Sequence, residues 1–310
     1  MQAGEFLPPA PLKSSAFLPR KFNQKELESA LVKIQPQGSK QPLFFIHPIG
    51  GNVFCYKELA RCLGSEQPFY GLQAPSLFGE CQTYNQIEDM AAHYIAAIRT
   101  VQSQGPYYLG GWSLGSIIAF EMAQQLQQQV QQVPGLFLLD NAAPTVCSQH
   151  IIMQPPDNSR ILANFAYDLA SSAGKNLSVS SEQFPQMHYE EQLHYVFEQL
   201  RLAHVIPANF SFDNFYLFLQ VYQNNLQAVW NYTPKVYSNR MILLQASESN
   251  EGFDYPHDPS WGWSKLSSEP LAIYTIPGNH YTMLIQPHVQ ILAEQLNNCL
   301  SQLEPGLIVK

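Results

Sequence analysis

The 310-residue sequence has few cysteines, no paired cysteine motif and no long hydrophobic run. Its five cysteines, at positions 55, 62, 81, 147 and 299, are scattered and odd in number, which favours free thiols in a reducing compartment over a disulfide framework. No apolar stretch approaches the roughly 18 residues needed to cross a bilayer. The N-terminus lacks a basic start followed by an apolar core, so we expect no signal peptide and no membrane association. We therefore predict a cytoplasmic protein.

Positive charge is also scarce. The chain carries 16 Lys and Arg against 24 Asp and Glu, for a net charge of −8, and contains no basic run. This balance argues against a nucleic-acid partner. The absence of Cys and His at metal-ligand spacing argues against a metal site, and we expect no bound cofactor. Hydrophobic residues make up 45% of the chain, enough for a large buried core.

Short apolar segments alternate with amphipathic ones from residue 41 onward. Strands of four to six apolar residues separated by helices are typical of a mostly parallel sheet with helices on both faces, so we predict an α/β fold. The predicted strands are 42–47, 68–73, 107–112, 135–140, 241–246 and 271–277, and the predicted helices between and after them are 53–64, 86–102, 114–129 and 289–303.

Two parts of the chain depart from this alternation. Residues 1–40 contain five prolines and one short amphipathic piece at 24–34, which indicates a linker or arm, with the folded domain starting near Gln41. Between Asp140 and Met241 the sequence has no clear strand and is rich in Phe and Tyr. An insertion of this size in such a sheet is typical of a functional element. Its predicted helices are 159–174, 190–204 and 212–232.

The segment "YYLGGWSLGSIIAF" (107–120) contains the pattern Gly-x-Ser-x-Gly around Ser113. The pentapeptide alone arises by chance about once in ten chains of this length. Here a predicted strand enters it and a predicted helix leaves it, which is the context that a nucleophilic serine on a sharp turn requires. The helix N-terminus favours developing negative charge beside the hydroxyl. We predict that Ser113 is a nucleophile; the alternative is a tight corner with an idle serine.

A nucleophilic serine needs a base, and in this type of fold the chain order is serine, acid, histidine. Three histidines follow the insertion. His280 lies just past a predicted strand in "TIPGNH", on a loop that can face Ser113. His288 is placed to begin the last helix, and His257 to lie on a loop. We therefore predict His280 as the base.

The acid has more than one candidate. Asp140 is a lone carboxylate that ends an apolar strand, where its burial requires a compensating partner. A histidine Nδ1–H supplies such a partner, so Asp140 is the preferred candidate, although a strand-end aspartate also caps turns. The other candidates follow the next strand and are Glu248, Asp254 and Asp258.

An oxyanion formed at the serine needs backbone donors. One is the N–H of Leu114, which follows the nucleophile. The loop "HPIGG" (47–51) after the first predicted strand supplies the other. Pro48 has no N–H, so we predict Ile49 as the second donor, with the glycines allowing close backbone approach. The alternative is a glycine-rich turn that only connects.

Several ordered blocks together resemble the thioesterase domains that end non-ribosomal peptide synthetases and polyketide synthases. They are "PLFFIHPIGGNVFCYKELARCLGSEQPFYGLQAP", "GPYYLGGWSLGSIIAFEMAQQL", "LFLLDNAAP" and "IPGNHYTMLIQPHV". The resemblance covers about 41–144 and 236–303 and implies an α/β-hydrolase fold over 41–310. It places 145–235 as the mainly helical lid and 1–40 as the linker from a carrier domain. Ser116 and Asn279 stand where glycine and aspartate are common.

The resemblance also implies a reaction. The substrate is a peptide or polyketide thioester on the phosphopantetheine arm of an upstream carrier protein. Ser113 is acylated, His280 is the base, Asp140 orients it, and Ile49 and Leu114 hold the oxyanion. Trp112 is similar to chain-terminating (type I) domains, whereas stand-alone editing enzymes usually have histidine there.

A large aromatic lid favours macrocyclic release over hydrolysis, because a folded chain presents its own nucleophile at an effective molarity of about 10⁵ M or more, against about 55 M for water. Simple hydrolysis, an editing thioesterase or esterase acting on free esters, and a non-catalytic binding module are the alternatives.

Overall fold

The computed structural model describes residues 22–78, 84–146, 157–177, 179–184, 187–249 and 258–303. Its strands are β1 (Leu31–Gln35), β2 (Leu43–Ile46), β3 (Phe69–Leu72), β4 (Tyr108–Trp112), β5 (Gly135–Leu139), β6 (Ile242–Ala246) and β7 (Ala272–Ile276). Its longer helices are α1 (Gln24–Ala30), α2 (Lys57–Leu63), α3 (Ile87–Ile98), α4 (Leu114–Gln128), α6 (Asn158–Ser172), α7 (Tyr189–Leu202), α8 (Phe212–Asn231) and α9 (His288–Leu303). All six predicted strands and all seven predicted longer helices are present.

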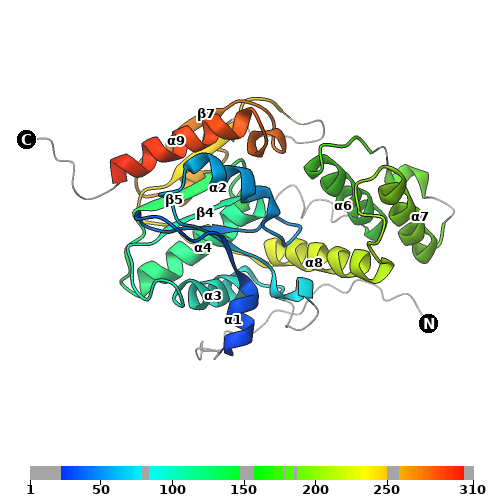
Figure 1. Cartoon of the computed structure of the whole chain (residues 1–310), viewed down its shortest axis with the longest axis horizontal. Helices are drawn as coiled ribbons and strands as arrows, with labels where there is room; N and C mark the ends of the chain where they lie inside the picture. The colour runs from blue at the N-terminus through cyan, green and yellow to red at the C-terminus, as the bar shows by residue number, and fades with distance from the viewer. Residues whose placement is uncertain are drawn as a thin grey trace, which may run out of the picture.

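The strands form one seven-stranded sheet in the order β1-β3-β2-β4-β5-β6-β7. Every neighbouring pair is parallel except β1 with β3. Helices α2 and α9 cover one face and α3 and α4 the other (Figure 1). The prediction of a mostly parallel sheet with helices on both faces is therefore confirmed.

The core lies in two layers, one on each side of the sheet. Successive strand residues point to opposite faces, so Phe44 packs into the layer under α3 and α4 while Phe45 packs into the layer under α2 and α9. Both side chains are fully buried. Because all four residues of β2 are buried, this central strand reads as a continuous apolar run rather than an alternating one.

The start of the folded domain differs from the prediction. Strand β1 pairs antiparallel with β3, with Leu31 opposite Leu72, so the sheet begins at Leu31 and not near Gln41. Helix α1 precedes this strand, and a capping box between Asn23 and Glu26 caps the N-terminus of the helix. As an edge strand, β1 is only partly buried, and its mixed sequence therefore lacked the apolar run used to identify the other strands. Residues 1–21, the rest of the predicted linker, lie outside the described residues.

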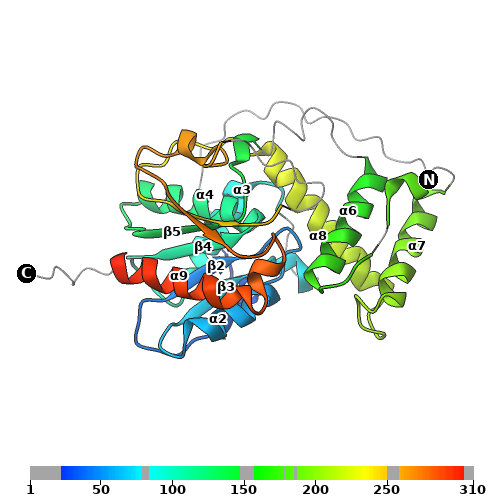
Figure 2. The same ribbon diagram turned by 90° about the horizontal axis from the view of Figure 1, so that it is seen from above.

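The insertion between β5 and β6 contains the three predicted helices. Helices α6, α7 and α8 lie together beside the sheet's helical layers (Figures 1 and 2) and share their own core, to which Phe165, Leu200 and Phe215 belong. Helix α8 runs from this cluster back toward α3 and the 3-10 turn Pro75–Phe78. The insertion is thus a packed helical unit joined to the sheet by its longest helix. Residues 147–156 of the predicted lid lie outside the described residues.

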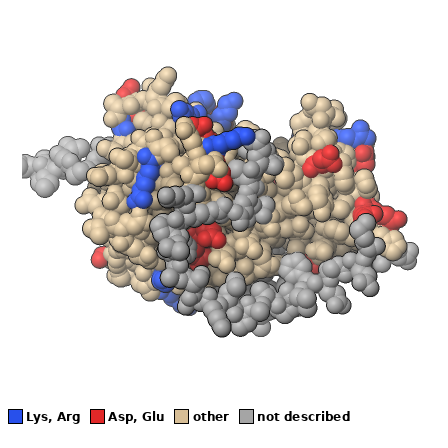
Figure 3. Space-filling view, turned by 90° about the horizontal axis from the view of Figure 1, so that it is seen from below, with Lys and Arg blue, Asp and Glu red and all other residues tan. Residues whose placement is uncertain are grey.

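The surface carries charges of both signs. On the face shown in Figure 3, Lys and Arg side chains are interspersed with Asp and Glu among mostly uncharged residues. None of the described helices is long and apolar enough to span a membrane.

Candidate active site

Ser113 lies on the turn between β4 and α4, and its backbone is strained. Its φ of 56° and ψ of −128° fall outside the regions that non-glycine residues ordinarily occupy, and such strain is concentrated at functional sites. The flanking glycines are sterically required. A Cβ on Gly111 would lie 2.2 Å from the carbonyl carbon of Gly115, and a Cβ on Gly115 would lie 2.2 Å from the carbonyl oxygen of Ile46. The pattern Gly-x-Ser-x-Gly is therefore a tightly packed turn.

Ser116 fastens this turn to the neighbouring strand. Its hydroxyl donates to the carbonyl of Gly111 at 2.8 Å and accepts from the N–H of Leu139 at 3.1 Å. The N–H of Ser113 also bonds to the carbonyl of Leu139, at 3.0 Å. Glycine is more common at position 116, and the serine found here adds buried hydrogen bonds that link the turn to β5.

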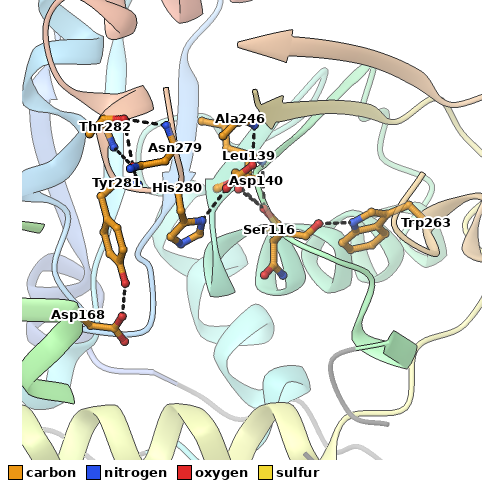
Figure 4. Close-up of polar contacts among 12 residues, drawn as sticks. Ser116, Leu139, Asp140, Asp168, Ala246, Trp263, Asn279, His280, Tyr281 and Thr282 are labelled. Atoms are coloured by element: carbon orange, nitrogen blue, oxygen red, sulfur yellow. Dashed lines mark hydrogen bonds and ion pairs between the residues drawn. The ribbon is translucent and has the colours of Figure 1, made fainter. Parts of the chain in front are cut away.

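Asp140 and His280 form a close buried pair (Figure 4). Nδ1 of His280 lies 2.7 Å from Oδ2 of Asp140, and the two residues are 5% and 1% exposed. Oδ1 of Asp140 accepts from the N–H of Ala246 at 2.6 Å, and its own N–H bonds to the carbonyl of Leu244 at 2.8 Å. Both carboxylate oxygens are therefore satisfied, as a buried charge requires. With Nδ1–H donating to Asp140, Nε2 of His280 is the ring atom able to accept a proton.

The other sequence candidates for the acid and the base lie elsewhere. Glu248 is exposed, Asp258 accepts from the backbone of Ser260 and Gly262, and His288 begins α9. Asp254 and His257 lie outside the described residues. Of the candidates that the structure describes, Asp140 and His280 are the acid and the histidine that lie within hydrogen-bond distance of each other.

Trp112 places His280 next to the Ser113 turn. The rings of Trp112 and His280 lie 4.7 Å apart at an interplanar angle of 35°, and Trp112 immediately precedes Ser113. The loop that carries His280 is held by Asn279, whose side-chain oxygen accepts from the N–H of Thr282 at 3.0 Å while the Thr282 hydroxyl accepts from the N–H of Asn279 at 2.8 Å. Aspartate is more common at this position, but Asn279 makes hydrogen bonds that close the turn containing His280.

The two predicted oxyanion donors border the same turn. Leu114 is the first residue of α4, where a backbone N–H has no partner within the helix. Ile49 follows β2, and among the residues that the structure describes no hydrogen bond occupies its N–H. Strands β2 and β4 are neighbours, with Ile46 opposite Gly111, so the Ile49 loop and the Ser113 turn leave the same edge of the sheet.

Three residues that the sequence did not indicate hold Ile49 in place. Nδ1 of His47 lies 2.7 Å from the carbonyl oxygen of Pro48, and its Nε2 lies 2.7 Å from the hydroxyl of Tyr94. Burial lowers the pKa of His47 to about 4, so the ring is neutral at pH 7, with Nδ1–H donating to Pro48. Asn225 of α8 donates to the carbonyl of Ile49 at 2.7 Å. Both peptide groups of Ile49 are thereby fixed.

The arrangement suits acyl transfer. A hydroxyl on a strained turn, a carboxylate-oriented imidazole and two backbone N–H groups at one edge of the sheet are the parts needed to attack a carbonyl and stabilise the resulting oxyanion. Within the described ranges, no group of three or more His, Cys, Asp and Glu side chains is placed to hold a metal ion.

Comparison with known proteins gives a consistent result. The sequence matches the thioesterase domain family over residues 41–300. A dimodular nonribosomal peptide synthase of Bacillus subtilis (strain 168) is 32% identical over 237 residues, which are 74% of this chain and 9% of that protein. The crystal structure of holo-AB3403, a four-domain nonribosomal peptide synthetase bound to AMP and glycine, has a TM-score of 0.80 and 30% identity, over 87% of this chain and 20% of that one.

An isolated domain shares the fold as well. The Vlm2 thioesterase domain has a TM-score of 0.62 at 24% identity, over 86% of this chain and 96% of that domain. The present chain therefore spans a small part of the synthetases that it matches, and nearly the whole of the single domain.

Proposed function

Because this chain belongs to the thioesterase domain family, we propose that it releases a peptide or polyketide acyl chain from the phosphopantetheine thioester of a carrier protein. The observation that carries the proposal is the buried Asp140–His280 pair, whose imidazole packs against Trp112, the residue before Ser113. The relatives support the identity of the partner, since they are multidomain synthetases in which the matching segment is a small fraction of the chain. An upstream carrier domain is therefore the proposed donor.

The first half of the reaction forms an acyl enzyme. His280 Nε2 takes the hydroxyl proton as Ser113 Oγ attacks the thioester carbonyl, and the N–H groups of Ile49 and Leu114 stabilise the oxyanion. Asp140 keeps the imidazole in the correct tautomer and stabilises its protonated form. The carbon–sulfur bond then breaks, the thiolate takes the proton from His280, and the acyl chain remains as an ester of Ser113.

The second half decides the product. A nucleophile loses its proton to His280 as it attacks the ester, and the proton returns to Ser113 Oγ. We propose that the nucleophile is a hydroxyl or amine of the acyl chain itself, giving a macrocycle. The helical insertion supports this choice, because its helices α6 and α8 contact the loops that carry His280 and Ile49, where they can shield a folded chain from water. Hydrolysis to a linear acid is the competing outcome.

The test is mass spectrometry of the products released from a panel of linear peptidyl and polyketidyl thioesters. Cyclic products lack one water relative to linear acids, so the two outcomes differ by about 18 Da. The Ser113→Ala variant must release neither, and a fluorophosphonate must label the wild type but not this variant. Retained release by Ser113→Ala would exclude the acyl-enzyme mechanism. Faster turnover of short oxygen esters than of thioesters would instead indicate an ordinary esterase.

A further inference from the structure

A carboxylate of the helical insertion is bonded to the residue that follows His280. Asp168 lies on α6, and its Oδ1 accepts the hydroxyl of Tyr281 in a short hydrogen bond. Its Oδ2 accepts the hydroxyl of Tyr222, on α8, at 2.7 Å. One side chain thus joins both of these lid helices to the loop that carries His280; Figure 4 shows its bond to Tyr281.

The surroundings of Asp168 make this contact strong. Desolvation raises the pKa of Asp168, while the two tyrosine hydroxyls and the nearby His280 favour its charged form. Among the described residues, no Lys or Arg forms an ion pair with it. A partly buried carboxyl group without a cationic partner depends on its hydroxyl donors, because a polar group removed from water is destabilising unless it is hydrogen-bonded.

Tyr281 transmits the contact to the catalytic pair. Its ring lies edge-on to His280, with centroids 5.2 Å apart, and edge-on to Trp112, with centroids 6.0 Å apart. The same ring also contacts Tyr167 of α6, with centroids 6.1 Å apart. Tyr281 therefore lies between the lid helix and the His280–Trp112 stack, and any shift of its hydroxyl toward or away from Asp168 displaces the ring that packs on His280.

We propose that Asp168 is a positioning residue, which fixes His280 by anchoring Tyr281 to lid helix α6. The inference rests on the proposed function, because it assigns Asp168 to the acyl transfer carried out by Ser113 and His280. Small misplacements of a base have large effects on rate, since proton transfer requires hydrogen-bond contact with the nucleophile. The anchor also links the base to α6, since Asp168 on that helix is the acceptor of the Tyr281 hydroxyl and Tyr281 packs on His280.

The chain offers a matched pair of variants to test this role. Tyr281→Phe and Tyr222→Phe each remove one hydroxyl from the same carboxylate, so a purely structural role predicts similar losses of thermal stability and of activity. Only Tyr281 belongs to the His280 loop. We expect similar drops in Tm for both variants, but a fall in kcat of about tenfold for Tyr281→Phe, with KM changed less than about twofold, and a much smaller effect on kcat for Tyr222→Phe.

A second measurement separates this inference from the proposed function. The rate at which a fluorophosphonate labels Ser113 depends on His280 but needs neither a carrier protein nor the natural acyl chain. We expect slow labelling of Tyr281→Phe and Asp168→Ala, and partial recovery with Asp168→Asn, which keeps an acceptor oxygen of the same geometry. Labelling of Tyr281→Phe at the wild-type rate, or equal losses in the two Phe variants, would overturn the inference alone. A wild type that is not labelled overturns the proposed function and this inference with it.

Discussion

Asp140 and His280 are separated by 140 residues of chain, yet Oδ2 of one lies 2.7 Å from Nδ1 of the other. Asp140 follows β5, the strand next to the one that leads into Ser113, and His280 follows β7. The carboxyl ends of parallel strands share one edge of the sheet, which explains how turns from distant parts of the sequence reach one site. This pair is the basis for the first prediction.

Replacing Asp140 with Asn should lower the acyl-transfer kcat by about 10³–10⁴-fold, because the amide no longer favours the required imidazole tautomer. The matched control is Glu248→Gln, which makes the same chemical change at the exposed carboxylate after β6. We expect its kcat to stay within about twofold of the wild type. Steady-state release from an acyl thioester measures both. A large loss for Glu248→Gln with little loss for Asp140→Asn would move the acid to the later strand.

Replacing Gly115 with Ala should destabilise the fold, because the new Cβ would lie 2.2 Å from the carbonyl oxygen of Ile46, a backbone atom that cannot easily move. Overpacking of this kind costs about 1–3 kcal/mol or more. Gly50→Ala is the control, since a Cβ there meets only the Asn52 side chain at 3.7 Å. Urea denaturation measures both variants, and equal unfolding free energies would show that the turn relaxes around the added methyl group.

Replacing Asn225 with Leu should reduce kcat more than it changes KM. The substitution keeps a side chain with four heavy atoms branched at Cγ but removes the amide that donates to the carbonyl of Ile49, so the N–H of Ile49 is less well aimed at the oxyanion. Complete loss of an oxyanion donor costs about 10²–10³-fold in kcat, and we expect a loss of about tenfold or more, below that ceiling. Asn224→Leu, one residue earlier on α8, is the control. A change in KM alone would assign Asn225 to substrate binding instead.

The Glu121 carboxylate should make stability depend on pH. Burial raises its pKa, and burial and the neighbouring Glu121 both raise the pKa of Glu88. Tyr232 and Gln125 donate to Glu121 at 2.7 and 2.8 Å, and Lys235 lies near enough to oppose the shift. A raised folded-state pKa means that the stabilisation is fully present below the ordinary carboxyl pKa and is lost as pH rises through the folded-state value.

The test compares the wild type with Glu121→Gln, whose amide does not titrate. The unfolding free energy of the wild type relative to this variant should decrease between about pH 4 and pH 7. Chemical denaturation across that range measures the difference. A difference that is constant, or that increases with pH, would contradict a raised pKa at Glu121.

The sequence identified most of the fold because its signals are local. Six strands appeared as short apolar runs: every residue of β2, β3, β4 and β5 is buried, and the edge strand β7 keeps an apolar run although it is partly exposed. Strand β1 was not predicted because it is an edge strand with an exposed lysine at position 33 and no apolar run. Its pairing with β3 depends on the sheet already being in place. The start of the folded domain was therefore placed too late.

Part of the site was also predictable from the sequence. Ser113 and its glycines lie in one short segment, and the fixed chain order of serine, acid and histidine selected Asp140 and His280, which the structure brings together; their catalytic roles stay predictions. The supporting residues had no such signal. Asn225 reaches Ile49 across 176 residues and Asp168 reaches Tyr281 across 113, and neither residue belongs to a recognisable pattern.

The sequence by itself determined the alternation of strands and helices, the glycine-flanked serine turn and the family of the chain. These features depend on residues that are close together in the sequence, which set the backbone conformation and the apolar pattern. Only the tertiary structure decided how the helical insertion is attached to the site. Those attachments include hydrogen bonds of Asn225 to Ile49 and of Tyr281 to Asp168, and which side chain meets which loop depends on how whole helices pack. The segment "GWSLG" thus determined the position of the strained Ser113 turn, while tertiary packing determined which side chains hold Ile49 and the His280 loop.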